Sequence, residues 1–192
     1  CDILFLLGGS ATTQVFDTTT LTLSTGPSLL ANANTGAVII PITTGTNAGK
    51  VVILHGGNTM TSSLLNADTL TVSTGPNTTT NIGGDAHYAE IPSGVHQGKF
   101  LIWDGGGTFS TNMLDPSTLT ISAGPADSVL TGPGSSTFLV RSGGQAGNIY
   151  KMRGGANTTT SIYRPATHDF IAGLAASCGP GAGAQNFYVA SG

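Results

Sequence analysis

The sequence predicts an all-β fold, a four-bladed β-propeller of four-stranded antiparallel blades. A Gly-Gly pair returns four times in the 192 residues, at intervals of 48, 49 and 49. Each cycle holds four short runs of β-branched and aromatic residues with turn residues between them, and no helical periodicity is present. A period near 50 residues is typical of propeller blades. The pairs are Gly8-Gly9, Gly56-Gly57, Gly105-Gly106 and Gly154-Gly155.

The runs that flank each glycine pair predict the first two strands of the repeat. The run before each pair is too short for a helix. These runs are residues 3–7, 51–55, 100–104 and 149–153. A further strand is expected after each pair, at residues 13–16, 63–65, 112–114 and 161–163.

A turn opened by Asp, Asn or an Arg-Pro pair is predicted before the next strand of each cycle. Asp and Asn favour turns because their side chains bond their own backbone, and Pro favours them because it presets φ. Thr alternates with apolar residues in three of these strands, which indicates one buried and one wet face. They are residues 20–24, 69–73, 118–122 and 168–172, and each ends near a Gly-Pro pair. The last strands of the cycles are residues 37–40, 87–90, 137–140 and 186–189.

The two ends of the chain predict how the ring closes. The strand at 186–190 has no following partner in the repeat, and the strand at 3–7 has no preceding one. Pairing of these two strands would complete sixteen strands in one domain of residues 1–192 and hide both sheet edges. An incomplete part of a larger ring is the alternative.

The repeat resembles the kelch family, in its bacterial and galactose-oxidase-like form. The best match is the stretch from His87 to Pro125, with the Gly98-Lys99 turn, the apolar run ending in Gly105-Gly106 and the turn at Asp115-Pro116. The resemblance implies a propeller fold over essentially the whole chain. The resemblance does not imply the copper site of galactose oxidase, because no Tyr-Tyr-His-His set stands at matching positions.

Composition favours an extracellular or cell-surface protein. Only 8% of residues are charged, the net charge is −3, and six residues are Lys or Arg. We therefore expect no nucleic-acid partner, and no apolar run is long enough for membrane insertion. Asn77 and Asn157 each begin an Asn-x-Thr sequence and are possible glycosylation sites, with ordinary turn residues as the alternative.

Three titratable residues share one position of the repeat, directly before a glycine pair. They are His55, Asp104 and Arg153, with Leu7 in the first copy. Rotational symmetry would place them at one level around the axis, where they would form a charge-assisted network or bind a small anion or sugar. Buried ion pairs or solvated strand ends are the alternative.

The other chemistry-bearing residues are sparse. Asp85, His87 and Glu90 gather around one strand, but they are too few for a metal centre, and no metal or cofactor is predicted. Asp85, Glu90 and Asp104 are the carboxylates expected to face the centre, yet no catalytic residue is assigned, because a glycosidase needs two carboxylates at a defined separation.

The two cysteines, Cys1 and Cys178, are expected on opposite faces of the disc, too far apart for an internal disulfide. An intermolecular bridge between them would join copies head to tail into a filament. Free cysteines or a lipid-modified Cys1 are the alternatives.

These features together predict a non-enzymatic extracellular scaffold that self-associates as a homo-oligomer or as the subunit of a surface filament or coat. Two alternatives remain open. One is a propeller that binds a glycan or a protein. The other is a carbohydrate-active hydrolase or lyase with an axial site built from His55, Asp104 and Arg153.

Overall fold

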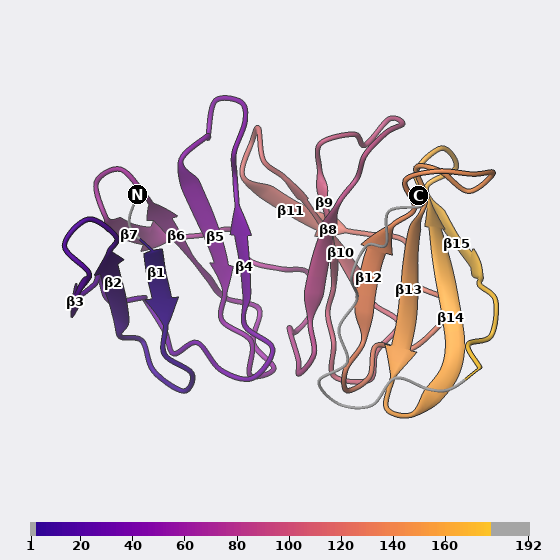
Figure 1. Ribbon diagram of the computed structural model, residues 1–192, viewed down its shortest axis with the longest axis horizontal. Helices are drawn as coiled ribbons and strands as arrows, with labels where there is room; N and C mark the ends of the chain where they lie inside the picture. Colours follow the sequence, from indigo (N-terminus) through magenta and orange to yellow (C-terminus); the bar gives the residue numbers. More distant parts are fainter. Residues whose placement is uncertain (1–2, 178–192) are drawn as a thin grey trace.

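The computed structural model describes residues 3–177, which form fifteen strands in four antiparallel sheets. Within that range the chain has no helix, and so none that could cross a membrane. The four sheets follow each other in chain order (Figure 1). The prediction of an all-β fold with four blades is therefore confirmed.

Each sheet is one blade, and its strands pair in the order of the sequence. Blade 1 consists of β1 (Ile3–Leu6), β2 (Thr13–Asp17) and β3 (Thr22–Thr25). Blade 2 consists of β4 (Val38–Pro41), β5 (Lys50–Leu54), β6 (Ser62–Asn66) and β7 (Thr71–Thr74). Blade 3 consists of β8 (His87–Glu90), β9 (Phe100–Trp103), β10 (Thr111–Asp115) and β11 (Thr120–Ala123). Blade 4 consists of β12 (Ser136–Leu139), β13 (Ile149–Gly154), β14 (Asn157–Arg164) and β15 (Asp169–Ala172).

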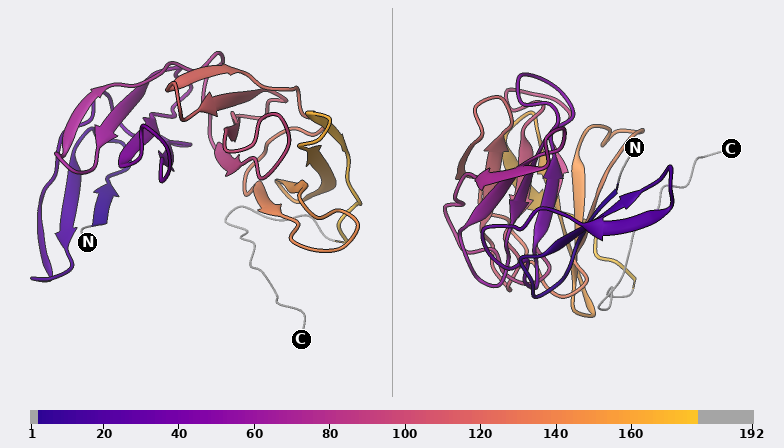
Figure 2. Two further views of the ribbon diagram at one scale, coloured as in Figure 1. Left: turned by 90° about the horizontal axis from the view of Figure 1, so that it is seen from above. Right: turned by 90° about the vertical axis from the view of Figure 1, so that its left-hand side faces the viewer.

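The described blades follow an arc, as the view from above in Figure 2 shows. The first strands of neighbouring blades contact each other, β4 with β8 and β8 with β12, so these strands form the inner side of the arc. Blade 1 has three strands within the described range, and β1 is its inner edge. The strand predicted at 186–190 lies outside the described residues, and closure of the ring stays a prediction.

Alternate residues of a strand face opposite neighbouring blades. This explains why the strands before the glycine pairs, such as β5 and β9, read as continuous apolar runs in the sequence. All four residues of β9 are buried. Phe100 and Ile102 pack with Val52 and Leu54 of blade 2. Leu101 and Trp103 pack with blade 4, against Ile149 and Tyr163.

The repeated glycine pair is required by a close approach of two backbone segments. Gly105 has a φ of +74°, a region that side chains rarely adopt, and a Cβ there would overlap the carbonyl oxygen of Gly84. Gly56 and Gly154 stand in the same way against the segments that lead into β4 and β12. The pair therefore marks the point where the second strand of a blade passes the start of the first.

The β10–β11 turn is held by an Asp that bonds its own backbone. The Asp115 Oδ1 atom accepts bonds from the Ser117 hydroxyl at 2.6 Å and the Ser117 N–H at 2.9 Å, and Lys99 Nζ lies 3.1 Å from Oδ2. The Ser117 hydroxyl bond is the main cause that lowers the pKa of Asp115 to about 2. The carboxylate is thus favoured in the folded state.

We expect stability to fall in acid because of this turn. A group whose folded pKa is lowered stabilises the fold above its unfolded pKa, and this contribution is lost as the pH falls through about 2. Urea unfolding at several pH values between 5 and 2 should therefore give a shallower acid decline for Asp115→Asn than for the wild type. Identical declines would contradict the assignment.

Candidate functional site

The three surfaces between adjacent blades, which we call seams, differ in chemistry. Seam 1–2 and seam 2–3 are built around apolar clusters, whereas seam 3–4 also contains a buried ion pair and several aromatic and histidine rings. Most of the titratable groups that could act on a ligand therefore lie at seam 3–4.

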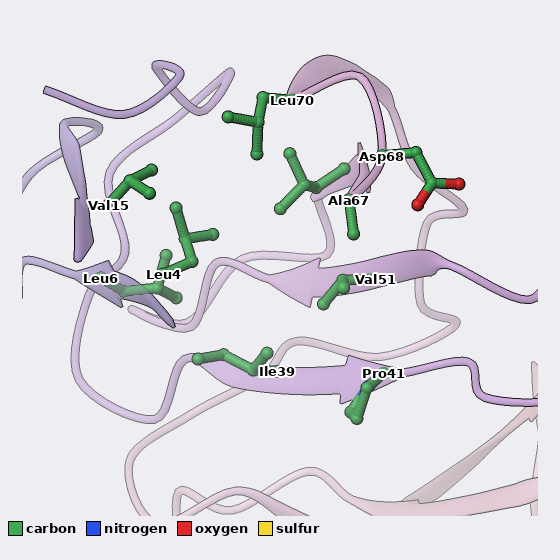
Figure 3. A pocket seen from close by; sticks show the side chains of 10 residues that line it. Leu4, Leu6, Val15, Ile39, Pro41, Val51, Ala67, Asp68 and Leu70 are labelled. Carbon is green, nitrogen blue, oxygen red and sulfur yellow. The ribbon is translucent and has the colours of Figure 1, made fainter. Parts of the chain in front are cut away.

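Seam 1–2 contains an apolar cavity of about 470 Å³ (Figure 3). Ile39 and Val51 line it, and the equivalent residues in seam 2–3 are the larger Tyr88 and Phe100, which pack edge to face with ring centroids 5.8 Å apart. The cavity exists because the smaller side chains leave this space. Its other aliphatic lining residues include Leu4, Leu6, Leu65 and Leu70.

His55 lies in seam 1–2, where it is almost fully buried. Its Nδ1 is 2.9 Å from Thr61 Oγ1 and its Nε2 is 2.8 Å from Ser63 Oγ. Ser63 Oγ also accepts the backbone N–H of Leu30, from the segment that links blades 1 and 2. Burial lowers the pKa of His55, so its ring helps to fasten this link as a neutral group.

Asp104 lies in seam 2–3 and is fully buried. Asn112 Nδ2 donates to Asp104 Oδ1 at 2.6 Å, and the Thr80 hydroxyl donates to Oδ2. Asn112 Oδ1 in turn accepts the N–H and hydroxyl of Thr79, so the group fastens the segment that links blades 2 and 3. Burial raises the pKa of Asp104.

The structure does not bring His55, Asp104 and Arg153 together. His55 and Asp104 belong to different seams, and Arg153 is half-buried beside Lys151 at seam 3–4. Among the described residues no hydrogen bond or ion pair joins any two of the three. Cys1 and Cys178 lie outside the described residues. Asn77 is exposed and Asn157 is half-buried, and glycosylation of either stays a prediction.

A buried ion pair forms the centre of seam 3–4. Lys151 Nζ lies 2.7 Å from Asp127 Oδ2, and both side chains are 0% exposed. The ammonium also donates to Val129 O at 2.7 Å and Thr131 Oγ1 at 3.0 Å, and Trp103 Nε1 donates to the same Asp127 oxygen at 2.9 Å. Burial lowers the pKa of Lys151 while Asp127 acts against this shift. Every donor of the ammonium is thereby satisfied.

His87 lies in β8, against the face of Trp103, with ring centroids 5.1 Å apart. Its Nδ1 is 3.0 Å from the carbonyl oxygen of Asp85, and its buried Nε2 has no hydrogen-bond partner among the described residues. Burial lowers the pKa of His87 to about 4, so the ring is neutral at pH 7.

Asp85 stands at a position where blades 2 and 4 have glycine. Two residues before the inner strand, blades 2 and 4 have Gly36 and Gly134 with φ of 79° and 75°, and Asp85 adopts the same left-handed backbone with φ of 64°. Its side chain is exposed, and Oδ1 accepts the N–H of Gly134 at 3.3 Å. Blade 3 thus presents a carboxylate at the inner side of the arc, at a conformational cost that glycine avoids.

Two histidines, His96 and His168, meet across seam 3–4. The rings of His96 and His168 have centroids 4.1 Å apart, and Tyr163 Oη is 2.8 Å from His168 Nδ1. Burial is the main cause that lowers the pKa of His168 and raises the pKa of Tyr163 to about 12. Sequence reasoning missed this cluster and the Lys151–Asp127 pair. Lys151 was detectable, because it replaces the isoleucines found at the same place in β5 and β9.

No protein-family model matches this chain, and no curated protein matches it. Among solved structures it is similar to a fungal alcohol oxidase of the AA5 family in complex with copper, with a TM-score of 0.59 and 18% sequence identity. The match covers 77% of this chain and 33% of the oxidase chain, so this chain corresponds to about a third of the oxidase. At this identity the likeness shows a shared propeller-like fold.

The prediction of a non-enzymatic scaffold, and of a protein that is not an enzyme, is contradicted by this comparison, because a solved structure that shares the fold is an enzyme. The scaffold prediction went together with the absence of an assigned catalytic residue in the sequence. Propeller sites gather single residues from several blades, so their function has no compact motif.

The described residues do not fit a copper centre with several protein ligands. No group of three or more His, Cys, Asp or Glu side chains among residues 3–177 could hold a metal ion. His55 engages both ring nitrogens within the fold, and His87 stacks on Trp103. We therefore derive no reaction step through copper.

Proposed function

We propose that this propeller belongs to a carbohydrate-active enzyme and that Asp85 is the carboxylate that contacts the sugar. The observation that carries the proposal is the exposed Asp85 side chain at a glycine position on the inner side of the arc. The shared fold with an alcohol oxidase supports an enzymatic role. An extracellular location, a kelch-type repeat and glycan binding are parts of the same proposal.

The surroundings of Asp85 suit the binding of hydroxyl groups. A carboxylate offers four lone-pair sites and accepts strong hydrogen bonds from hydroxyl donors. Asp85 Oδ1 has one long bond, to Gly134 N–H at 3.3 Å, and so retains acceptor capacity. Its backbone carbonyl is bound by His87, whose ring is fixed on Trp103. The backbone of Asp85 is therefore anchored through His87 to the buried Trp103.

The carboxylates at the inner side favour a reaction other than two-carboxylate hydrolysis. Glycosidases place two carboxyl groups about 5–9.5 Å apart. Glu90 stands five residues after Asp85, which corresponds to roughly 16 Å along an extended chain. Asp104 is fully buried. Neither Glu90 nor Asp104 thus gives Asp85 an exposed carboxylate partner at that separation, and we assign Asp85 to substrate positioning in a lyase or an oxidising enzyme.

The proposal is tested by incubating the full chain with soluble polysaccharides and simple alcohols. Three products are followed: hydrogen peroxide, new reducing ends and the ultraviolet absorbance of unsaturated uronic acids. Asp85→Asn preserves shape and removes the charge, and we expect it to lower the detected activity about tenfold or more, since a charged hydrogen bond contributes about 1.5–3 kcal/mol.

Val95→Ala, in the exposed β8–β9 turn, serves as the control and should keep full activity. Equal activity of Asp85→Asn and the wild type would contradict the role of Asp85. A wild type that yields none of the three products and binds no glycan would contradict the proposed function itself.

A further inference from the structure

The His96–His168 pair joins two blades at the end of seam 3–4 where the β8–β9 and β14–β15 turns meet. His96 belongs to the first turn, and His168 directly precedes β15. Their ring centroids are 4.1 Å apart. Tyr163, which is fully buried in β14, fixes His168 through its hydroxyl.

Blade packing at this place does not require histidine. In seam 2–3 the equivalent residues are Asn47 and Leu119. Asn47 stands two residues before Gly49, as His96 stands two residues before Gly98. Leu119 directly precedes β11, as His168 directly precedes β15. Asn47 Nδ2 donates to the carbonyl oxygens of Pro116 and Ser117 at 2.8 and 2.9 Å, and this fastens the turn of the next blade. An amide and an aliphatic residue therefore suffice to pack two blades at this position. The packing of the blades does not explain why seam 3–4 has two histidines there.

A second observation points to a missing partner. His96 Nδ1 is buried and has no hydrogen-bond partner among the described residues. A buried nitrogen without a partner is costly, and native proteins usually satisfy it by water, an ion or a protein group. An imidazole nitrogen at this position can offer its lone pair to a metal ion.

The ligand chemistry selects a class of ion. Imidazole nitrogen binds Zn²⁺, Cu²⁺ and Ni²⁺, whereas Mg²⁺ and Ca²⁺ prefer oxygen. Two nitrogens that share one Zn²⁺ each lie about 2 Å from it, so they must come within about 4 Å of each other. Rings in contact satisfy this with small side-chain rotations. Tyr163 supports His168, because a metal-binding His donates its second N–H to a neighbouring acceptor.

We propose that His96 and His168 together bind one divalent transition-metal ion across seam 3–4, with Tyr163 as the positioning residue of His168. Two protein ligands leave the remaining coordination positions to water, so the ion exchanges with solvent. This site is separate from Asp85 and does not depend on the proposed carbohydrate activity.

The test measures binding of Zn²⁺, Ni²⁺ and Cu²⁺ alone to the full chain, by calorimetry and by the shift of the thermal midpoint. Cys1→Ser and Cys178→Ser are included throughout so that thiols do not compete. The variants are His96→Asn and His168→Leu, the residues that this chain itself uses at the equivalent positions. We expect one ion per chain, no binding of Mg²⁺, and at least a tenfold weaker affinity in either variant.

The Cu²⁺ complex gives an independent readout, because two coordinated imidazoles produce nitrogen hyperfine structure in its electron paramagnetic resonance spectrum. Tyr163→Phe should keep the ion but weaken its binding. Circular dichroism of the metal-free variants checks that they are folded. Equal affinity in the wild type and the double variant His96→Asn, His168→Leu, or the same spectrum in both, would overturn the proposal.

Discussion

Lys151→Ile is expected to destabilise the protein by about 3–5 kcal/mol, although isoleucine occupies the same position in blades 2 and 3. The reason is that the substitution leaves the Asp127 carboxylate buried without its ammonium partner. Trp103 Nε1 and the Val129 N–H remain its hydrogen-bond donors, and these two bonds do not offset a buried charge. Asp127→Leu should cost a similar amount, since it leaves the Lys151 ammonium unpaired.

The double variant Lys151→Ile, Asp127→Leu should recover at least half of the loss. Seam 1–2 contains Leu29 and Ile53 at the same two positions, within one apolar cluster, so this chain already uses the pair in packed form. Replacing a buried ion pair by apolar residues is often neutral or stabilising. Here the recovery is reduced, because Trp103 Nε1 and the Val129 N–H both lose their acceptor. Urea unfolding of the four proteins gives the coupling energy. Additive losses would show that the ion pair is not the main interaction of this seam.

Gly105→Ala is the second substitution with a large expected effect, a loss of about 2–6 kcal/mol. The strain of a side chain at φ +74° costs about 1–3 kcal/mol, and overlap with the Gly84 carbonyl adds about 1–3 kcal/mol. Gly144→Ala is the control, because nothing lies within 4 Å of a Cβ there. It should change stability by less than about 0.5 kcal/mol. Similar losses in both variants, measured by urea unfolding, would contradict the close approach of the two backbones.

Gly8→Ala tests the predicted closure of the ring in the same series. In the described part of the chain nothing lies within 4 Å of a Cβ at Gly8, because blade 1 has no strand inside β1. Pairing of residues 186–190 with β1 would bring to Gly8 the same backbone neighbour that Gly105 has. Gly8 lacks the positive φ of Gly105, so closure predicts only the overlap part of that loss, about 1–3 kcal/mol, and an open edge predicts almost none.

The glycine repeat made most of the fold predictable from sequence. A side chain at the glycine pair would clash with the neighbouring backbone, so the spacing of the pairs indicates the length of each blade. The alternation of Thr with apolar residues indicates the exposed outer strands. The arrangement of the seams was less accessible. Which neighbour Trp103 or Lys151 faces depends on the alternation within β9 and β13, and this becomes clear only when the blades are placed side by side.

The candidate site was predictable only in part. The sequence pointed to residues that precede the glycine pairs, but His55 and Asp104 are turned into separate seams and fasten the links between blades. Asp85 was noted as a carboxylate near the centre, whereas its left-handed backbone required the structure. The contact of His96 and His168 joins turns 72 residues apart in the chain, and no local pattern carries that information.

The most direct test of the proposed role of Asp85 is to measure the free energy of unfolding and the carbohydrate activity together for Asp85→Gly. Glycine is the residue of blades 2 and 4 at this position, so the substitution should leave stability unchanged or raise it by about 0.5–1 kcal/mol. Activity should nevertheless fall about tenfold or more, since the sugar loses a charged hydrogen-bond acceptor. Full activity in a variant of equal or higher stability would contradict this role, because Asp85 would then be an ordinary turn residue.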